Sequence, residues 1–405
     1  MTRCRAASLL ALLVLSVGAG TGRAQTPFAL QNIGQRAVAD DARMVARGFG
    51  MTVTDSLHPG FKNVASLSSL RHVALKFTGY GERTDSRDQT GERRTYRTYS
   101  PDVRVGVPVL KTRLALTAGF TVLRTTAYQT RRDTTMEFPF EPPYIGEGPN
   151  ANFQFIREGS MFSVPLGVAL QPLPGISLGG SLNLVRGSNV DTASDRFLVT
   201  GYQNSTLIAE ETYNGTSVTW AVLVAPGRRF RLGASWTPGY DVGVERKVEM
   251  QGVGDRARSS FTMRMPEETW AGIEARVVGR WRIGADAHFT EFSGYRGRED
   301  WERTAKDEYS WSVGIERIQG RERRAGASNL PLRLSTGYRR WAYTINGASV
   351  DERSYAVGTG FPFRNDMGHF DLAISYNRIG DRGDNGYESD VWRLTVSVTG
   401  LEAWW

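Results

Sequence analysis

The chain has 405 residues, a formal net charge of +8 and one cysteine, Cys4. That cysteine precedes the apolar stretch 6–20, so it cannot be a lipoprotein acceptor, and the rest of the chain has no thiol for a disulfide or a metal site. The positive charges are spread along the chain, which argues against a nucleic-acid-binding protein.

Residues 1–24 predict a secretory signal peptide. Arg3 and Arg5 form a basic start, residues 6–20 an apolar core, and Gly22-Arg23-Ala24 a cleavage site of small residues. We expect the mature chain to begin at Gln25. Cleavage would remove three arginines and lower the net charge from +8 to +5.

Residues 25–70 do not share the pattern of the rest of the chain. The segment is too rich in glycine for a good helix and too interrupted for a strand, yet it carries apolar side chains that need burial. We predict that it forms a plug, or hatch, inside the structure built by residues 71–405. The candidate plug residues are Gly48, Phe49, Gly50, Met51, Asp55, Phe61, Asn63, Ala65 and Leu67.

From residue 71 onward, apolar side chains recur at every second position. Near the C-terminus, for example, Trp392, Leu394 and Val396 alternate with Arg393 and Thr395. This alternation is typical of a strand with one buried or lipid-facing side. No stretch of the mature chain reaches about 18 consecutive apolar residues, so the sequence predicts no transmembrane helix.

The predicted connections between these strands alternate between short and long. Short turns are expected near residues 108–111, 172–175, 226–229, 278–281 and 364–368, with a longer one at 319–329. Long polar loops are expected near residues 83–94, 125–152, 187–205, 251–258, 293–307, 346–351 and 380–388. Short turns at one end and long loops at the other are typical of outer-membrane barrels.

The fold predicted is therefore all-β, a transmembrane antiparallel β-barrel of about 14 strands spanning residues 71–405. It is expected in the bacterial outer membrane with both termini in the periplasm. Pro266 lies inside a predicted strand and implies a bulge or kink there. A barrel of this width cannot fill its lumen with its own side chains, which is why residues 25–70 are expected to occupy it.

Two further patterns concern the membrane. Aromatic residues gather at predicted strand ends, as in interfacial girdles: Tyr80, Tyr96, Tyr99, Trp236, Tyr240, Trp270, Trp281, Trp311, Trp341 and Tyr343. The C-terminal stretch from Leu401 to Trp405 resembles the assembly signal that the barrel-assembly machinery reads. The expected partners are accordingly that machinery, outer-membrane lipid and a hydrophobic ligand.

Several motifs resemble those of the FadL/TodX family of outer-membrane transporters for long-chain fatty acids and aromatic hydrocarbons. They are Arg47-Gly-Phe-Gly-Met51, Asn63-Val-Ala-Ser-Leu67, Leu232-Gly-Ala-Ser-Trp-Thr-Pro238 and Arg264-Met-Pro-Glu267. Val64 stands where the plug motif of that family has proline. The resemblance implies non-catalytic uptake of a hydrophobic or amphipathic small molecule, which rests in an apolar pocket and leaves sideways through a gap beside a kinked strand.

A broader branch of that superfamily contains PorV-type barrels, which carry secreted proteins. This supplies the main alternative, a shuttle or scaffold for secreted proteins. It predicts a sealed lumen and an apolar patch on the loops.

An outer-membrane enzyme is the second alternative, and it would need a cluster of His, an acid and Ser at the loop rim. A separate set of polar residues is expected to face the lumen. They are Arg282, Asp286, His288, Arg333 and Arg393. Asp286 and His288 come nearest to an acid–base pair, but no nucleophile motif accompanies them, and we expect a hydrogen-bonded pair. The arginines could steer a carboxylate or line a polar wall, and we favour the wall. The four histidines are far apart in sequence, so no metal site is expected. No cofactor and no catalytic activity are expected either.

Overall fold

The computed structural model describes residues 28, 34–37, 40–54, 59, 62–89, 91–110, 113–135, 150–198, 203–227, 229–251, 256–297, 305–319, 330–363 and 367–402. Within these residues, none of the helices combines the length and hydropathy needed to cross a bilayer.

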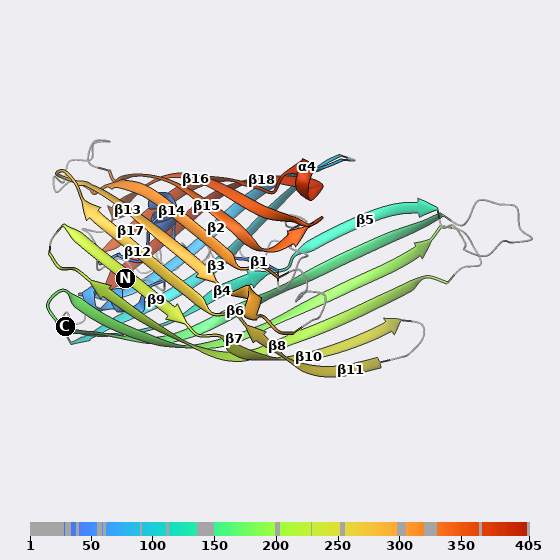
Figure 1. Cartoon of the computed structure of the whole chain (residues 1–405), viewed down its shortest axis with the longest axis horizontal. Helices are drawn as coiled ribbons and strands as arrows, with labels where there is room; N and C mark the ends of the chain where they lie inside the picture. Colours follow the sequence, from blue (N-terminus) through green and yellow to red (C-terminus); the bar gives the residue numbers. More distant parts are fainter. Residues whose placement is uncertain are drawn as a thin grey trace, which may run out of the picture.

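A closed antiparallel β-barrel of fourteen strands forms the wall, which confirms the predicted fold (Figure 1). Three of these strands are each interrupted once and so carry two labels: β4 with β5, β9 with β10, and β11 with β12. The last strand pairs with the first, from Tyr387↔Asp88 to Glu402↔Val73, and this closes the barrel.

The wall segments follow each other in chain order. They are β2 (Val73–Asp88), β3 (Glu92–Leu110), β4 (Leu114–Thr125), β5 (Tyr128–Thr135), β6 (Asn150–Leu173), β7 (Ile176–Phe197), β8 (Ser205–Val224), β9 (Phe230–Thr237), β10 (Tyr240–Gln251), β11 (Arg256–Met265), β12 (Glu268–Arg276), β13 (Trp281–Thr290), β14 (Glu308–Arg317), β15 (Leu332–Ile345), β16 (Ala348–Phe363), β17 (Gly368–Ile379) and β18 (Tyr387–Glu402). A short helix, α4 (Arg382–Asn385), and a 3-10 turn, η4 (Phe292–Gly294), lie between strands.

The outer face of the barrel carries a belt of exposed apolar side chains. Leu116, Leu166 and Leu232 are each 46–47% exposed, although aliphatic groups of this size are normally buried in a soluble protein. Their strand neighbours point into the lumen, as the period of two predicts. The belt therefore fits a surface that faces lipid.

The expected aromatic girdle is only partly present. Trp236 and Trp311 face outward and are 42% and 47% exposed, whereas Trp341 and Tyr343 are buried inside the barrel. Trp270 also faces the lumen, where it stacks on His288. The expectation was wrong for these three residues, for Tyr80, which is 3% exposed, and for Tyr240, which faces the lumen. The face of a strand residue is set by its parity along the strand, not by its closeness to the strand end.

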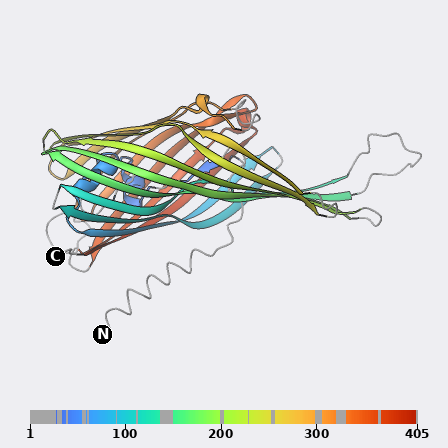
Figure 2. The same ribbon diagram turned by 90° about the horizontal axis from the view of Figure 1, so that it is seen from below.

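The strands differ greatly in length. β6, β7 and β8 have 24, 22 and 20 residues, whereas β13 and β14 have 10 each. About 9–11 residues are enough to cross a membrane. At the long-loop end, β6–β8 therefore continue beyond the belt. Together with β5, β10 and β11 they form one sheet there, which we call the extension (Figures 1 and 2).

Several segments expected to be loops are strand instead. Residues 83–88 belong to β2, 92–94 to β3, and 187–197 to β7. The connection expected at residues 346–351 is a two-residue turn in which Asn346 and Gly347 have φ of 52° and 78°. Polar composition suggested loops here because these strand residues are mostly polar, and polarity alone does not separate such a strand from a loop.

Two short elements occupy the lumen near the short-turn end, where Figure 2 shows a helix enclosed by the wall. They are α2 (Ala42–Arg47) and the 3-10 helix η3 (Val64–Ser69). Asp41 caps α2 by accepting the N–H of Met44 at 2.7 Å, and Gly48 ends it with φ of 71°. A two-residue strand, β1 (Gln35–Arg36), pairs with β4. The segment boundaries after residues 24 and 70 stay predictions.

Two neighbouring strands are interrupted at the same height. β9 and β10 are separated by Pro238 and Gly239, and β11 and β12 by Pro266 and Glu267. The interruption at Pro266 agrees with the expected kink, because proline cannot donate to the ladder. On the neighbouring strand, β8 pairs with β10 up to Gly215 and with β9 only from Trp220 onward.

Candidate functional site

Buried ion pairs fasten the plug to the wall. The guanidinium of Arg47 is fully buried, with Nη2 2.8 Å from Glu274 Oε2 and Nη1 3.2 Å from Glu316 Oε2. One helical turn earlier, Arg43 Nε lies 2.9 Å from Glu316 Oε1. Charges buried this deeply are tolerated only when paired, so α2 is tied to β12 and β14.

Asp286 holds the glycine-rich turn that follows α2. Its Oδ2 accepts the N–H of Gly50 at 2.6 Å and that of Met51 at 3.2 Å. The expected hydrogen bond between Asp286 and His288 is therefore wrong. The imidazole of His288 instead contacts Arg36 Nη1 and Thr290 Oγ1, each at 2.9 Å, although it projects from the same strand face.

Glycines in the wall make room for the plug side chains. A Cβ at Gly284 would lie 2.6 Å from the ring of Phe49, and one at Gly272 would lie 2.6 Å from Met51 Cβ. At Gly233 it would lie 2.3 Å from the carbonyl oxygen of Met51. Sequence reasoning missed these glycines, although their inward parity on β9, β12 and β13 was a usable signal.

The second plug motif is also fully enclosed. Asn63 Nδ2 donates to the carbonyl oxygens of Met51 at 2.7 Å and Val222 at 3.1 Å, which joins the two plug turns to β8. Asn63 Oδ1 accepts the N–H of Ala65 and so begins η3 without the proline of the family motif. Ala65 and Leu67 are 0% exposed.

Three predicted residues, Asp55, Phe61 and Trp405, lie outside the described residues. Leu401 is half-buried and packs at the edge of the apolar cluster around η3.

Each of the three predicted lumenal arginines faces a carboxylate. Arg282 Nη1 lies 3.2 Å from Glu274 Oε1. Arg333 Nη1 lies 2.6 Å from Asp371 Oδ1, and Arg393 Nη2 lies 2.6 Å from Glu82 Oε2. These contacts make the arginines part of a polar wall.

A cavity of about 350 Å³ lies between the plug and the wall. Its lining contains both charged and apolar residues, which differs from the apolar pocket expected. We call these two sets of residues its charged side and its apolar side. The charged side consists of Arg36, Asp40, Lys62, Arg104, Arg124, Glu268, His288, Glu308, Arg339 and Glu352. The apolar side is lined by Val122, Leu123, Met161, Val185, Tyr240 and Met265. The cavity can therefore receive a molecule that has both a polar and an apolar part.

Trp270 packs against the charged side. Its indole stacks on His288 with ring centroids 4.0 Å apart, and Lys62 Nζ lies 4.6 Å from the indole centroid. Arg36 Cζ lies 5.1 Å from the same ring. The aromatic face thus holds two plug cations at the cavity by cation–π attraction. The sequence placed Trp270 in the girdle and gave no sign of this role.

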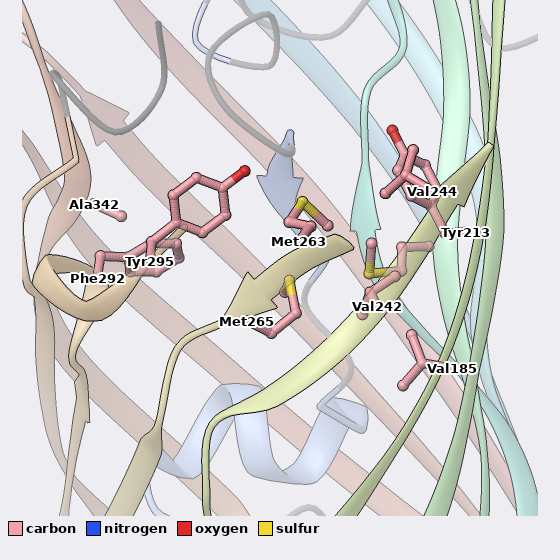
Figure 3. Packing of buried hydrophobic residues seen from close by; sticks show 10 residues of the cluster. Val185, Tyr213, Val242, Val244, Met263, Met265, Phe292, Tyr295 and Ala342 are labelled. Carbon is pink, nitrogen blue, oxygen red and sulfur yellow. The ribbon is translucent and has the colours of Figure 1, made fainter. Parts of the chain in front are cut away.

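Apart from Val122, the apolar side belongs to a larger cluster in the long-loop half of the barrel (Figure 3). Val242 and Val244 on β10 and Met263 and Met265 on β11 project from neighbouring strands into this cluster. Phe292 and Tyr295 complete the cluster, and their segment is joined to β11 by a bridge between Arg264 and Arg296. Flexible methionines at such a surface can adapt to ligands of different shape.

The cavity also reaches the interrupted part of the wall. Ser217 and Thr219 on β8, and Ser235 and Thr237 on β9, line it there. Residues 216–219 of β8 have no ladder partner on β9 or β10 in the described part of the chain. The site is therefore adjacent to a stretch of wall that is not closed by main-chain hydrogen bonds.

The sequence profile of the BamG family matches residues 1–405. The chain belongs to the BamG family. No curated protein matches this BamG-family sequence.

Solved structures similar to the BamG-family chain share its fold at low sequence identity. A FadL homologue from Pseudomonas aeruginosa has a TM-score of 0.59 at 11% identity, covering 90% of this chain and 99% of its own. The toluene transporter TodX of Pseudomonas putida has a TM-score of 0.58 at 15% identity, covering 91% and 99%. The toluene transporter TbuX of Ralstonia pickettii has a TM-score of 0.58 at 12% identity, covering 90% and 98%. The expected resemblance to FadL and TodX is thus confirmed for the fold.

Among the described residues of this BamG-family chain, no group of three or more His, Cys, Asp or Glu side chains is placed to hold a metal ion.

Proposed function

We propose that the chain is an outer-membrane channel that takes up hydrophobic or amphipathic small molecules without catalysis. The observation that carries this proposal is the cavity of about 350 Å³, which is lined by both charged and apolar residues and touches the interrupted wall. The structural similarity to hydrocarbon transporters supports the same class of function.

The ion pairs of the plug favour one exit path for the ligand over another. Because Arg43 and Arg47 are held by buried carboxylates, a straight path toward the short-turn end would require several charges to separate inside the lumen. The interruption beside Thr219 needs no such separation. We therefore place entry at the long-loop end and exit sideways, with both termini on the periplasmic side.

The proposal is tested by native mass spectrometry of the full chain purified in mild detergent, followed by extraction of bound lipid. The variant V185D/M265D puts charge on the apolar side of the cavity and should reduce bound ligand and uptake by about tenfold, since a buried unpaired charge is costly. The control V190D lies on the solvated outer face of the extension and should retain both. Equal loss in both variants would contradict the proposal.

A second function, a scaffold for protein partners, is favoured by the extension. In the described residues, β5 pairs only with β6, and β11 meets the wall beyond β10 only at the Arg264–Arg296 bridge. Free strand edges are templates for an added strand. The name BamG also suggests a link to barrel assembly, and the C-terminal signal Leu401 to Trp405 stays a prediction of that kind.

The scaffold function can be tested with a photo-crosslinking residue at Ser259 on β11, compared with one at the lipid-facing Leu394. Capture at Ser259 of a single protein partner, in an amount nearly equal to that of the barrel itself, would favour the scaffold. Capture of lipid alone at both positions would favour uptake.

A further inference from the structure

The interrupted part of the wall is lined by hydrogen-bonding groups. Asn183 Nδ2 on β7 donates to Ser217 Oγ at 3.2 Å and to Thr219 Oγ1 at 3.0 Å. The Oγ1 atoms of Thr219 and Thr237 share a hydrogen bond of 2.7 Å. Hydrocarbon side chains would suffice for a gap that passes only hydrocarbons, so this lining calls for another explanation.

The Thr219–Thr237 bond crosses the wall where the main-chain ladder ends. Trp220 and Trp236 form the last paired position between β8 and β9, and the two threonines come directly after it. A side-chain hydrogen bond thus joins β8 and β9 at the border of the interruption where their main-chain pairing ends. Widening the gap from this border would separate the two hydroxyls.

The same hydroxyl row is connected to the plug. Ser235 Oγ, two residues before Thr237, donates to the carbonyl oxygen of Lys62 at 2.9 Å. Lys62 in turn lies over Trp270 at the charged side of the cavity. Polar groups therefore line the cavity between its charged residues and the gap.

The lipid-facing side of this border is apolar and aromatic. Trp220 and Trp236 are 57% and 42% exposed there and occupy directly paired positions. Indole rings suit the region where acyl chains meet polar groups. The border therefore presents hydroxyls to the lumen and aromatic surface to the bilayer.

We propose that the transported molecule is an amphiphile with an uncharged, hydrogen-bonding head group, and that its head group replaces the Thr219–Thr237 bond as it passes. This inference rests on the proposed uptake function and names its substrate class. While Asn183 still donates to Ser217 and Thr219, a hydrocarbon in the widened gap leaves the Thr219 and Thr237 hydroxyls without the bond they make to each other. A head group with hydroxyl and ester oxygens satisfies them, while its acyl chain lies against the two tryptophans.

The test compares monopalmitoylglycerol with hexadecane, which have acyl or alkyl chains of the same length. Uptake is measured in a bacterial host without its own channels for such compounds, using the full chain. The wild type should take up monopalmitoylglycerol at least about tenfold faster than hexadecane. The variant T219V/T237V, which keeps side-chain shape and removes the hydroxyls, should lose that preference, because each unmade hydrogen bond costs about tenfold.

Two controls separate this effect from damage to the barrel. T192V/T212V makes the same change on the outer face of the extension and should leave the preference intact. T219S/T237S keeps the hydroxyls and should also keep it, even if the valine variant assembles poorly. Equal wild-type uptake of both compounds, or equal slowing of both in T219V/T237V, would overturn the inference and leave the uptake function standing. Failure to take up either compound would overturn both.

Discussion

Arg47 and Glu316 form one contact of a buried network in which a single carboxylate serves three guanidinium groups. Glu316 Oε2 lies 3.2 Å from Arg47 Nη1, and its Oε1 lies 2.9 Å from Arg43 Nε and 3.0 Å from Arg333 Nε. Two of these arginines come from the plug and one from β15. The network thus links the plug to two strands of the wall.

The network predicts unequal effects of its members. E316Q leaves three buried guanidinium groups undercompensated and should lower the free energy of unfolding by about 3–5 kcal/mol. R47M should cost less, about 1–3 kcal/mol, because Glu274 keeps Arg231 and Arg282. Thermal and denaturant unfolding in detergent measures both. A larger effect for R47M than for E316Q would contradict the network as described.

The close approach of plug and wall predicts that a single methyl group is harmful at Gly284. G284A should destabilise the fold by about 1–3 kcal/mol, because its Cβ would overlap the ring of Phe49. G400A is the matched control, since nothing lies within 4 Å of a Cβ there. G284A should destabilise the F49A variant by less than it destabilises the wild type, because the ring that its Cβ would overlap is gone. Melting temperatures in detergent decide the comparison.

Asp286 is expected to act by holding the turn at Gly50 and Met51. D286A should expose both amides and raise their hydrogen-exchange rates by about tenfold or more, because each loses its acceptor. D286N keeps an acceptor oxygen and should show a smaller increase. Unchanged exchange in D286A would show that other contacts hold the turn.

Trp270 is expected to keep Lys62 and Arg36 at the cavity. W270A should reduce the ligand retained through purification by about fivefold, since the cation–π surface is lost. W270F keeps an aromatic face and should change retention by less than about twofold. Native mass spectrometry of the detergent-purified chain gives the ratio of loaded to empty protein. Equal retention in the two variants would assign the effect to cavity shape.

The period of two made the barrel predictable, because every lipid-crossing strand must alternate, and it also placed Arg333, Arg393 and Asp286 in the lumen. The enclosed position of Phe49 and Leu67 followed from the need to bury them. The partners of these residues were not predictable, because Glu274, Glu316 and Gly284 are distant in sequence and only the barrel register brings them to the plug. The extension was missed for a related reason: a strand made mostly of polar residues, as in 187–197, has the composition of a loop.

The unequal strand lengths give the opening at the long-loop end a preferred side of approach. At about 3.3 Å per residue, the 24 residues of β6 extend roughly 80 Å along the strand, against roughly 33 Å for the 10 residues of β14. Molecules that diffuse along the membrane surface meet a tall barrier on the side of β5–β8 and a low rim on the side of β13 and β14. A neighbouring protein could therefore stand close to the opening on the low side. The orientation of the barrel in the plane of the membrane would then decide which neighbour delivers ligand to the opening.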